Sequence, residues 1–176
     1  MFERVGRELV YHGSILDVYQ DSVNVPNGNV AKWDYIGHKG AAAVVPVTDD
    51  GKIIMVKQYR NAIERMALEI PAGGRNGADE PTRDAAAREL EEETGYKSDD
   101  LELLISIVPA IAYSSEIIDI YVARNLKPSK QHLDEDEFVD VCEYTVDELC
   151  EMIYSLKNQD AKTIAAIMTY KAKYCK

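Results

Sequence analysis

The feature that most constrains this chain is a predicted helix that carries an acidic face. Pro81 suits the first position of a helix and Gly95 suits the residue that ends one, so a helix is predicted between them. Residues three and four positions apart are neighbours on a helix surface, which places three glutamates together: Glu89, Glu92 and Glu93. Such a run most often marks only a solvated surface, so its meaning depends on the surrounding pattern.

Turn signals between apolar runs predict strands on both sides of this helix. Asn27-Gly28 follows an alternating segment and is typical of a hairpin, since both positions accept positive φ. The apolar runs 42–47 and 53–56 flank an Asp-Asp-Gly turn and predict a second hairpin. Similar runs at 101–108 and 117–122 predict a third pair of strands.

Two more helices are predicted towards the C-terminus. Thr145 and Glu148 have the spacing of a capping box, and an apolar stripe follows them. The last helix is predicted from about Asp160 towards Lys173. Several strands interrupted by one helix and followed by two others predict an α/β (α+β) fold with a mixed sheet.

Length and charge limit the domain organisation and the partners. The 176 residues suffice for one domain with a small appendage. The formal net charge of −11, from 20 Lys and Arg against 31 Asp and Glu, disfavours binding to long nucleic acids. No apolar run has the length of a membrane span, and the N-terminal residues do not form a signal peptide. A cytoplasmic protein that acts on a small molecule is therefore expected.

The acidic helix belongs to a longer pattern with fixed spacing. This pattern runs through Gly74, Glu80, Arg88-Glu89-Leu90, Glu92-Glu93 and Gly95-Tyr96. It resembles the Nudix box, the signature of the Nudix hydrolase family, at each charged and glycine position. Tyr96 departs from it, because the family has an aliphatic residue there. Pro71-Ala72-Gly73 also resembles the start of the box in one branch, so Gly73 shares the predicted role of Gly74.

The resemblance implies a metal-dependent hydrolase and assigns roles to the charged residues. Carboxylates are suitable ligands for Mg²⁺ or Mn²⁺, which neutralise phosphate charge and activate water. Glu89 and Glu93 are the implied core ligands, Glu92 is an auxiliary ligand, and Arg88 holds the carboxylates in place. The predicted metal set is completed by Gly73, Glu80 and Glu116. For Glu80 three roles stay open: binding an outer metal, orienting Arg88, or helping to start the helix.

Motifs outside the box resemble the ADP-ribose pyrophosphatase branch of the family. Gln58-Tyr59-Arg60 and the segment 68–73 precede the box in that branch, so Arg60 is expected to contact a phosphate and Glu69 to lie near the metals. Trp33 matches a position from which related enzymes stack on adenine, although an ordinary core or interface ring is an equal alternative. The loop 109–116 departs from the branch, because Ile111 replaces its signature proline.

The acidic segment 133–139 resembles the part of these enzymes that supplies the general base. Glu137 is the first candidate and Glu135 the second. If neither carboxylate acts, Glu116 or Glu92 remains. The predicted nucleophile in every case is water.

The resemblance therefore implies hydrolysis of a nucleoside diphosphate derivative, with ADP-ribose giving AMP and ribose 5-phosphate. It also implies a mixed sheet sandwiched between helices for residues 41–176, and an N-terminal strand subdomain, residues 1–40, that forms a homodimer contact. The alternatives are a Nudix hydrolase for a nucleotide sugar or a dinucleotide, and a non-catalytic nucleotide-binding regulator. The intact set of glutamates argues against the regulator.

Overall fold

The computed structural model describes residues 1–13, 16–133, 135 and 138–175. These residues divide into two compact units, which are treated separately below. The N-terminal unit consists of residues 1–40 and 108–117, and the larger unit consists of 41–107 and 118–176. Within the described part of the chain, no helix combines the length and the apolar character that crossing a membrane requires.

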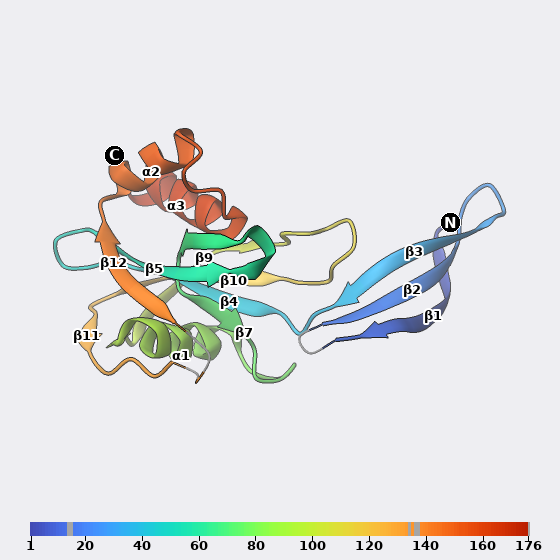
Figure 1. The fold of residues 1–176 in the computed structure, drawn as a ribbon, viewed down its shortest axis with the longest axis horizontal. Helices are drawn as coiled ribbons and strands as arrows, with labels where there is room; N and C mark the ends of the chain where they lie inside the picture. Colours follow the sequence, from blue (N-terminus) through green and yellow to red (C-terminus); the bar gives the residue numbers. More distant parts are fainter. Residues whose placement is uncertain (14–15, 134, 136–137, 176) are drawn as a thin grey trace. The chain divides into compact units, whose positions relative to one another are not determined.

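The N-terminal unit contains an antiparallel sheet with the strand order β1-β2-β3 (Figure 1). Its strands are β1 (Glu3–His12), β2 (Asp17–Asn24) and β3 (Val30–Gly37). The predicted hairpin joins β2 to β3, but of its two turn residues only Gly28 has a positive φ, 87°. The Asn27 side chain instead accepts a hydrogen bond from the Asn29 amide, which stabilises the turn without a left-handed asparagine.

The larger unit is built around a mixed sheet with the order β7-β4-β10-β9. Its strands are β4 (Ala41–Pro46), β7 (Ala72–Gly74), β9 (Asp100–Ile107) and β10 (Ile118–Arg124). Strands β4 and β10 are parallel, and the remaining neighbours are antiparallel. A second antiparallel sheet has the order β12-β5-β6, from β5 (Ile53–Arg60), β6 (Arg65–Glu69) and β12 (Val139–Tyr144). The short strands β8 (Tyr96–Lys97) and β11 (Lys127–Pro128) pair with each other.

The second predicted hairpin forms only at its turn. Val47 and Ile53 pair there as an isolated bridge. Beyond it the two strands separate, with β4 in the mixed sheet and β5 in the second sheet. The prediction of strands is confirmed and the prediction of a hairpin is wrong, because pairing with distant strands outweighs pairing across the turn.

Helices cover both faces of the mixed sheet, as Figure 1 shows. They are α1 (Thr82–Thr94), α2 (Val146–Tyr154) and α3 (Ala161–Tyr174), with a short 3-10 turn, η1, at Asn61–Ile63. Strand β4 is buried along its whole length, since its alternate side chains face opposite layers. Ala42 and Val44 pack towards α1, whereas Ala43 and Val45 pack towards α2 and α3. The predicted mixed sheet between helices is confirmed.

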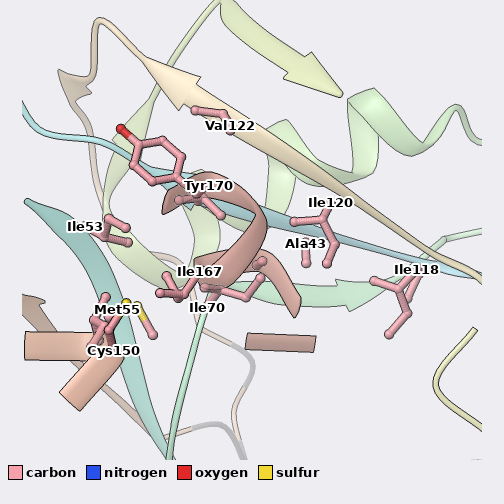
Figure 2. Packing of buried hydrophobic residues seen from close by; sticks show 14 residues of the cluster. Ala43, Ile53, Met55, Ile70, Ile118, Ile120, Val122, Cys150, Ile167 and Tyr170 are labelled. Carbon is pink, nitrogen blue, oxygen red and sulfur yellow. The ribbon is translucent and has the colours of Figure 1, made fainter. Parts of the chain in front are cut away.

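The main core lies between the sheets and the two C-terminal helices. Figure 2 shows Ile167 and Tyr170 of α3 and Cys150 of α2 packed over the strand residues Ile53 and Met55. The capping box predicted at the start of α2 is present, with the Thr145 side chain accepting from the Glu148 amide. These local signals fix where the helices begin, and the buried stripes attach them to the sheets.

Candidate active site

Helix α1 places the box glutamates at the edge of the mixed sheet. The helix ends at Gly95, which has the left-handed conformation (φ 72°) expected of a C-terminal cap, and its amide donates to the Glu91 carbonyl. Pro81 was expected at the first helical position and instead precedes it as the N-cap, in an extended conformation. The difference is one residue, which leaves the acidic face of the helix unchanged.

Two of the box glutamates are buried. Glu89 is 8% exposed and Glu93 is 3% exposed, and they lie one helical turn apart. A merely solvated acidic face is therefore excluded for these two positions. Burying a carboxylate is costly unless cations and hydrogen bonds compensate it, so paired buried glutamates indicate a functional site.

Arg88 is the centre of the cluster. Its guanidinium donates to the Glu89 carboxylate at 2.6 Å and to the Glu92 carboxylate at 2.9 Å. It also lies 3.3 Å from a carboxylate oxygen of Glu80 and donates to the Gly74 carbonyl at 2.9 Å. One guanidinium thus contacts three carboxylates and the backbone of β7, which fixes the relative positions of the helix and the strand.

The backbone of β7 lies directly against the buried carboxylates. The Ala72 amide donates to the Glu93 carboxylate at 3.1 Å. A Cβ atom on Gly73 would stand 2.2 Å from a carboxylate oxygen of Glu89, whereas one on Gly74 would meet nothing within 4 Å. Only glycine at position 73 allows this approach. Gly73 therefore packs against Glu89, while Gly74 provides the carbonyl that binds Arg88.

Glu80 joins the cluster from the loop before α1. One of its oxygens accepts from the Asn76 amide at 2.5 Å, and the other faces Arg88. The hydrogen bond from Asn76 and the neighbouring Arg88 hold the pKa of Glu80 below its usual range. Of the three roles left open for Glu80, contact with Arg88 is the one that the geometry supports.

The donor set fits a divalent cation. Three carboxylates share one guanidinium, so the cluster has an excess of negative charge. Carboxylate oxygens are also the hard ligands that Mg²⁺ and Mn²⁺ prefer. The close approach of Gly73 brings backbone next to the Glu89 carboxylate. Among the described residues, however, no three acidic, imidazole or thiol groups already form a metal-binding arrangement. The ligand assignment stays a prediction.

Arg60 and Glu69 form a second charged cluster, on β5 and β6. The Arg60 guanidinium donates two hydrogen bonds to the Glu69 carboxylate, at 2.7 and 2.8 Å. Lys162, at the start of α3, donates to the same carboxylate. Burial raises the pKa of Glu69, but the hydrogen bonds from Arg60 and the charge of Lys162 outweigh it and lower the pKa to about 2. Glu69 is therefore ionised and paired with Arg60. The predicted contact of Arg60 with a phosphate stays a prediction.

This cluster lines a cavity of about 510 Å³ between β6 and the start of α3. Its wall includes apolar side chains such as Met66 and Leu68 and the cations Arg60, Arg65 and Lys162. Nothing in the sequence marked Lys162, which is separated from Glu69 by most of the larger unit. In the sequence, Asp160-Ala161-Lys162-Thr163 indicates only the start of a helix.

The segment before the acidic stretch is fastened to the end of α1. The Gln131 side-chain amide donates to the Glu93 carbonyl at 2.7 Å, and the His132 amide donates to the Glu92 carbonyl at 2.9 Å. Sequence reasoning missed both contacts. Of the two candidate bases, Glu135 is exposed and Glu137 lies outside the described residues.

Trp33 and Glu116 belong to the N-terminal unit. Trp33 lies on β3, is 49% exposed, and its ring contacts Phe2 with a centroid separation of 6.0 Å. Because the ring is exposed, it is not part of the core of this unit. The two remaining interpretations of Trp33 are stacking on adenine and a position in an interface. Glu116 lies 3.7 Å from His38, in a segment whose Ser115 amide donates to the Ile36 carbonyl of β3.

Comparison with known proteins agrees with the box. A family model described as NUDIX domain matches residues 37–167. The chain is 40% identical over 171 residues to the ADP-ribose pyrophosphatase of Bacillus subtilis, covering 96% of this chain and 92% of that protein. It is 42% identical over 162 residues to the methanol dehydrogenase activator of Bacillus methanolicus, covering 91% and 87%. A crystal structure of an ADP compounds hydrolase shares the fold, with a TM-score of 0.85, 23% identity, and coverage of 97% and 92%.

Proposed function

This chain belongs to the Nudix hydrolase family, and we propose that it hydrolyses ADP-ribose to AMP and ribose 5-phosphate with a divalent cation, Mg²⁺ or Mn²⁺. The observation that carries the proposal is the buried pair Glu89 and Glu93, set against the Gly73 backbone and tied to Arg88. The substrate rests on the similarity to an ADP-ribose pyrophosphatase over nearly the whole chain.

The cation would be held by Glu89, Glu93 and Glu92 together with the backbone at Gly73. Bound there, it supplies positive charge to the phosphate oxygens and makes a water molecule more acidic. Arg88 keeps the carboxylates in position, and Glu80 orients Arg88 through its own carboxylate. The geometry of Arg88 supports this role, because its donors are divided among different carboxylates.

The reaction itself needs a base and a means of binding the phosphates. Water attacks one phosphorus of the diphosphate, the bond from that phosphorus to the bridging oxygen breaks, and the proton from water passes to Glu137 or Glu135. Gln131 and His132 donate hydrogen bonds to the end of α1, so the acidic stretch that follows them begins beside the box. This position supports the assignment. Arg60 is the proposed phosphate contact, and Trp33 the proposed adenine contact.

We also propose that the chain forms a homodimer through its N-terminal unit. Strand β1 is an edge strand, and several of its large apolar side chains are exposed, namely Val5, Leu9, Val10 and Tyr11. Exposed apolar side chains on an unpaired edge favour association with another chain. Light scattering after size-exclusion chromatography measures the mass directly.

The experiment that tests the function is a phosphate-release screen coupled to a phosphatase. Its substrates are ADP-ribose, nucleotide sugars, dinucleotides and dinucleoside polyphosphates, each with Mg²⁺ and with Mn²⁺. We expect ADP-ribose to have the highest kcat/KM and EDTA to abolish the activity. A higher kcat/KM for a nucleotide sugar or a dinucleotide would replace the proposed substrate, and no activity on any of them would contradict hydrolysis.

One relative favours a second function. Because the methanol dehydrogenase activator is similarly related, this chain is also a candidate activator of a dehydrogenase. The Glu93→Gln variant separates the two roles. Activation that survives in this variant would indicate a regulator that acts without hydrolysis, whereas loss of both activities would tie activation to hydrolysis.

A further inference from the structure

Lys162 is a nearly buried cation whose role the box does not explain. Its side chain is 12% exposed, and its ammonium group contacts the carboxylates of Glu69 and Asp160. Both Lys162 and Glu69 line the cavity between β6 and the start of α3. A lysine that loses most of its hydration here requires compensation from these carboxylates.

The start of α3 is fixed to β6 and to Ile70, the residue that follows β6, by hydrogen bonds on both sides of Lys162. The Ile70 amide donates to the Thr163 hydroxyl at 2.9 Å, and the Asn158 side-chain amide donates to the Leu68 carbonyl at 3.0 Å. The Asp160 carboxylate accepts from the Thr163 amide at 3.0 Å and thereby caps the helix. Lys162 is therefore held against Glu69 by the backbone as well as by charge.

The charges around Glu69 balance only because Lys162 is present: Arg60 and Lys162 carry two positive charges, and Glu69 and Asp160 carry two negative charges. Glu69 has one negative charge and is shared by two cations, Arg60 and Lys162. The charge of Asp160 also compensates the positive end of α3, where it caps the first turn. Without Lys162, Arg60 alone would oppose the charges of Glu69 and Asp160, and an anionic ligand would meet a net negative charge.

We infer that Lys162 is a positioning residue for substrate binding: it shares the charge of Glu69 and so keeps the Arg60 guanidinium available to a phosphate of the substrate. Arg60 suits this contact because its side chain is 43% exposed beside the cavity, whereas Glu69 is 5% exposed. The inference rests on the proposed function, in which Arg60 binds a phosphate of ADP-ribose. It adds a residue that acts through Arg60 and does not itself touch the phosphate.

The Lys162→Met variant tests this role. We expect its KM for ADP-ribose to rise about tenfold while kcat stays within about twofold, because the lost interaction is made equally in the ground state and the transition state. Lys162→Arg should restore KM, since it returns the charge at the same place. If Lys162→Met does not fold, Lys162→Gln retains a hydrogen-bond donor without the charge, and the same rise is expected.

Lys157→Met is the matched control. Lys157 lines the same cavity and is exposed, and its substitution removes the same charge. If only the net charge of the cavity mattered, both variants would raise KM equally, and that result would overturn the inference.

A double-mutant cycle tests whether Lys162 acts through Arg60. In an Arg60→Met background, Lys162→Met should change KM by less than about twofold, because residues that act as a unit are not additive. An undiminished tenfold effect in this background would show that Lys162 acts independently of Arg60, which contradicts the inference.

Calorimetric binding of ADP-ribose in the presence of EDTA separates this inference from the proposed function. Lys162→Met should raise the dissociation constant of ADP-ribose, and Lys162→Arg should restore it, as expected for KM. This measurement needs no hydrolysis. An inactive wild-type protein would count against the proposed function alone. Equal dissociation constants for the wild-type protein and Lys162→Met would overturn the role of Lys162 even if ADP-ribose is hydrolysed.

Discussion

The two charged clusters of the larger unit have opposite compositions. Around Arg88, one cation is shared by the carboxylates of Glu80, Glu89 and Glu92. Around Glu69, one carboxylate is shared by Arg60 and Lys162. The first cluster therefore has a surplus of negative charge, whereas in the second Lys162 also pairs with Asp160 and the charges balance. Because buried charge is costly, the negative surplus of the first cluster favours a divalent cation. At the second cluster, the partly exposed Arg60 guanidinium is the group proposed to bind a phosphate.

The clusters also differ in how the backbone supports them. The first lies between one helix and strand β7, and it depends on a glycine that lets the strand approach Glu89. The second joins β5 and β6 to the start of α3, and it depends on hydrogen bonds between distant segments. We therefore expect the first to be disrupted by added volume and the second by removal of a cation.

The largest effect is expected for the buried glutamates. Glu93→Gln and Glu89→Gln should each lower kcat at least about 10³-fold, because a neutral side chain binds the cation weakly and stabilises the transition state less. Steady-state kinetics at saturating Mg²⁺ measures this loss. Asp84→Asn, an exposed change on the same helix, should leave kcat unchanged. Turnover close to wild type in both glutamate variants would contradict the metal assignment.

A smaller loss is expected for the general base, for which Glu137 is the first candidate. Glu137→Gln should lower kcat about 10²- to 10³-fold without changing the affinity for the cation, because a base acts mainly in the transition state. Glu135→Gln should have a milder effect, and Asp140→Asn serves as an exposed control. If Glu135→Gln lowers kcat more than Glu137→Gln does, the base is Glu135. If both variants are fully active, the base is Glu116 or Glu92.

Gly73→Ala tests the backbone approach in the first cluster. Its Cβ atom would overlap the Glu89 carboxylate, which lies at the end of a flexible side chain and can move aside. We expect the melting temperature to change little and kcat/KM to fall about 10- to 100-fold, as for other changes next to metal ligands. Gly74→Ala is the matched control, since its Cβ would meet nothing within 4 Å. Equal activity in the two variants would contradict the role of Gly73.

The smallest effect is expected for Trp33, which tests whether recognition extends to the N-terminal unit. If the exposed ring stacks on adenine, Trp33→Ala should raise KM for ADP-ribose about tenfold, as expected for a lost base–aromatic contact, and leave kcat nearly unchanged. Trp33→Phe should recover most of the binding. An unchanged KM with a lower melting temperature would assign the ring to an interface.

Local signals in the sequence predicted where helix α1 ends and where helix α2 begins. The end of α1 at Gly95 and the capping box at Thr145 depend on a few adjacent residues, and both were predicted correctly. The separation of β4 and β5 could not be predicted, because it depends on pairing with strands far along the chain.

The second cluster was accessible from the sequence only in part. The resemblance marked Arg60 and Glu69, but not their ion pair, which forms across neighbouring strands. Lys162 lies 93 positions beyond Glu69 and has no motif of its own, so only the tertiary structure brings it into view. The resemblance also marked Gly73, but the reason that glycine is needed there, its contact with Glu89, comes only from the structure.

The most direct test of the contrast between the clusters is a titration with Mn²⁺, followed by the loss of the free-ion signal in electron paramagnetic resonance. The wild-type protein should bind Mn²⁺, and Glu93→Gln should bind it at least about tenfold more weakly because a ligand charge is lost. Lys162→Met should bind Mn²⁺ like the wild type, since its cluster is proposed to attract anions. Equal Mn²⁺ affinity in the wild-type protein and Glu93→Gln would contradict the central claim that the cluster around Arg88 is the cation site.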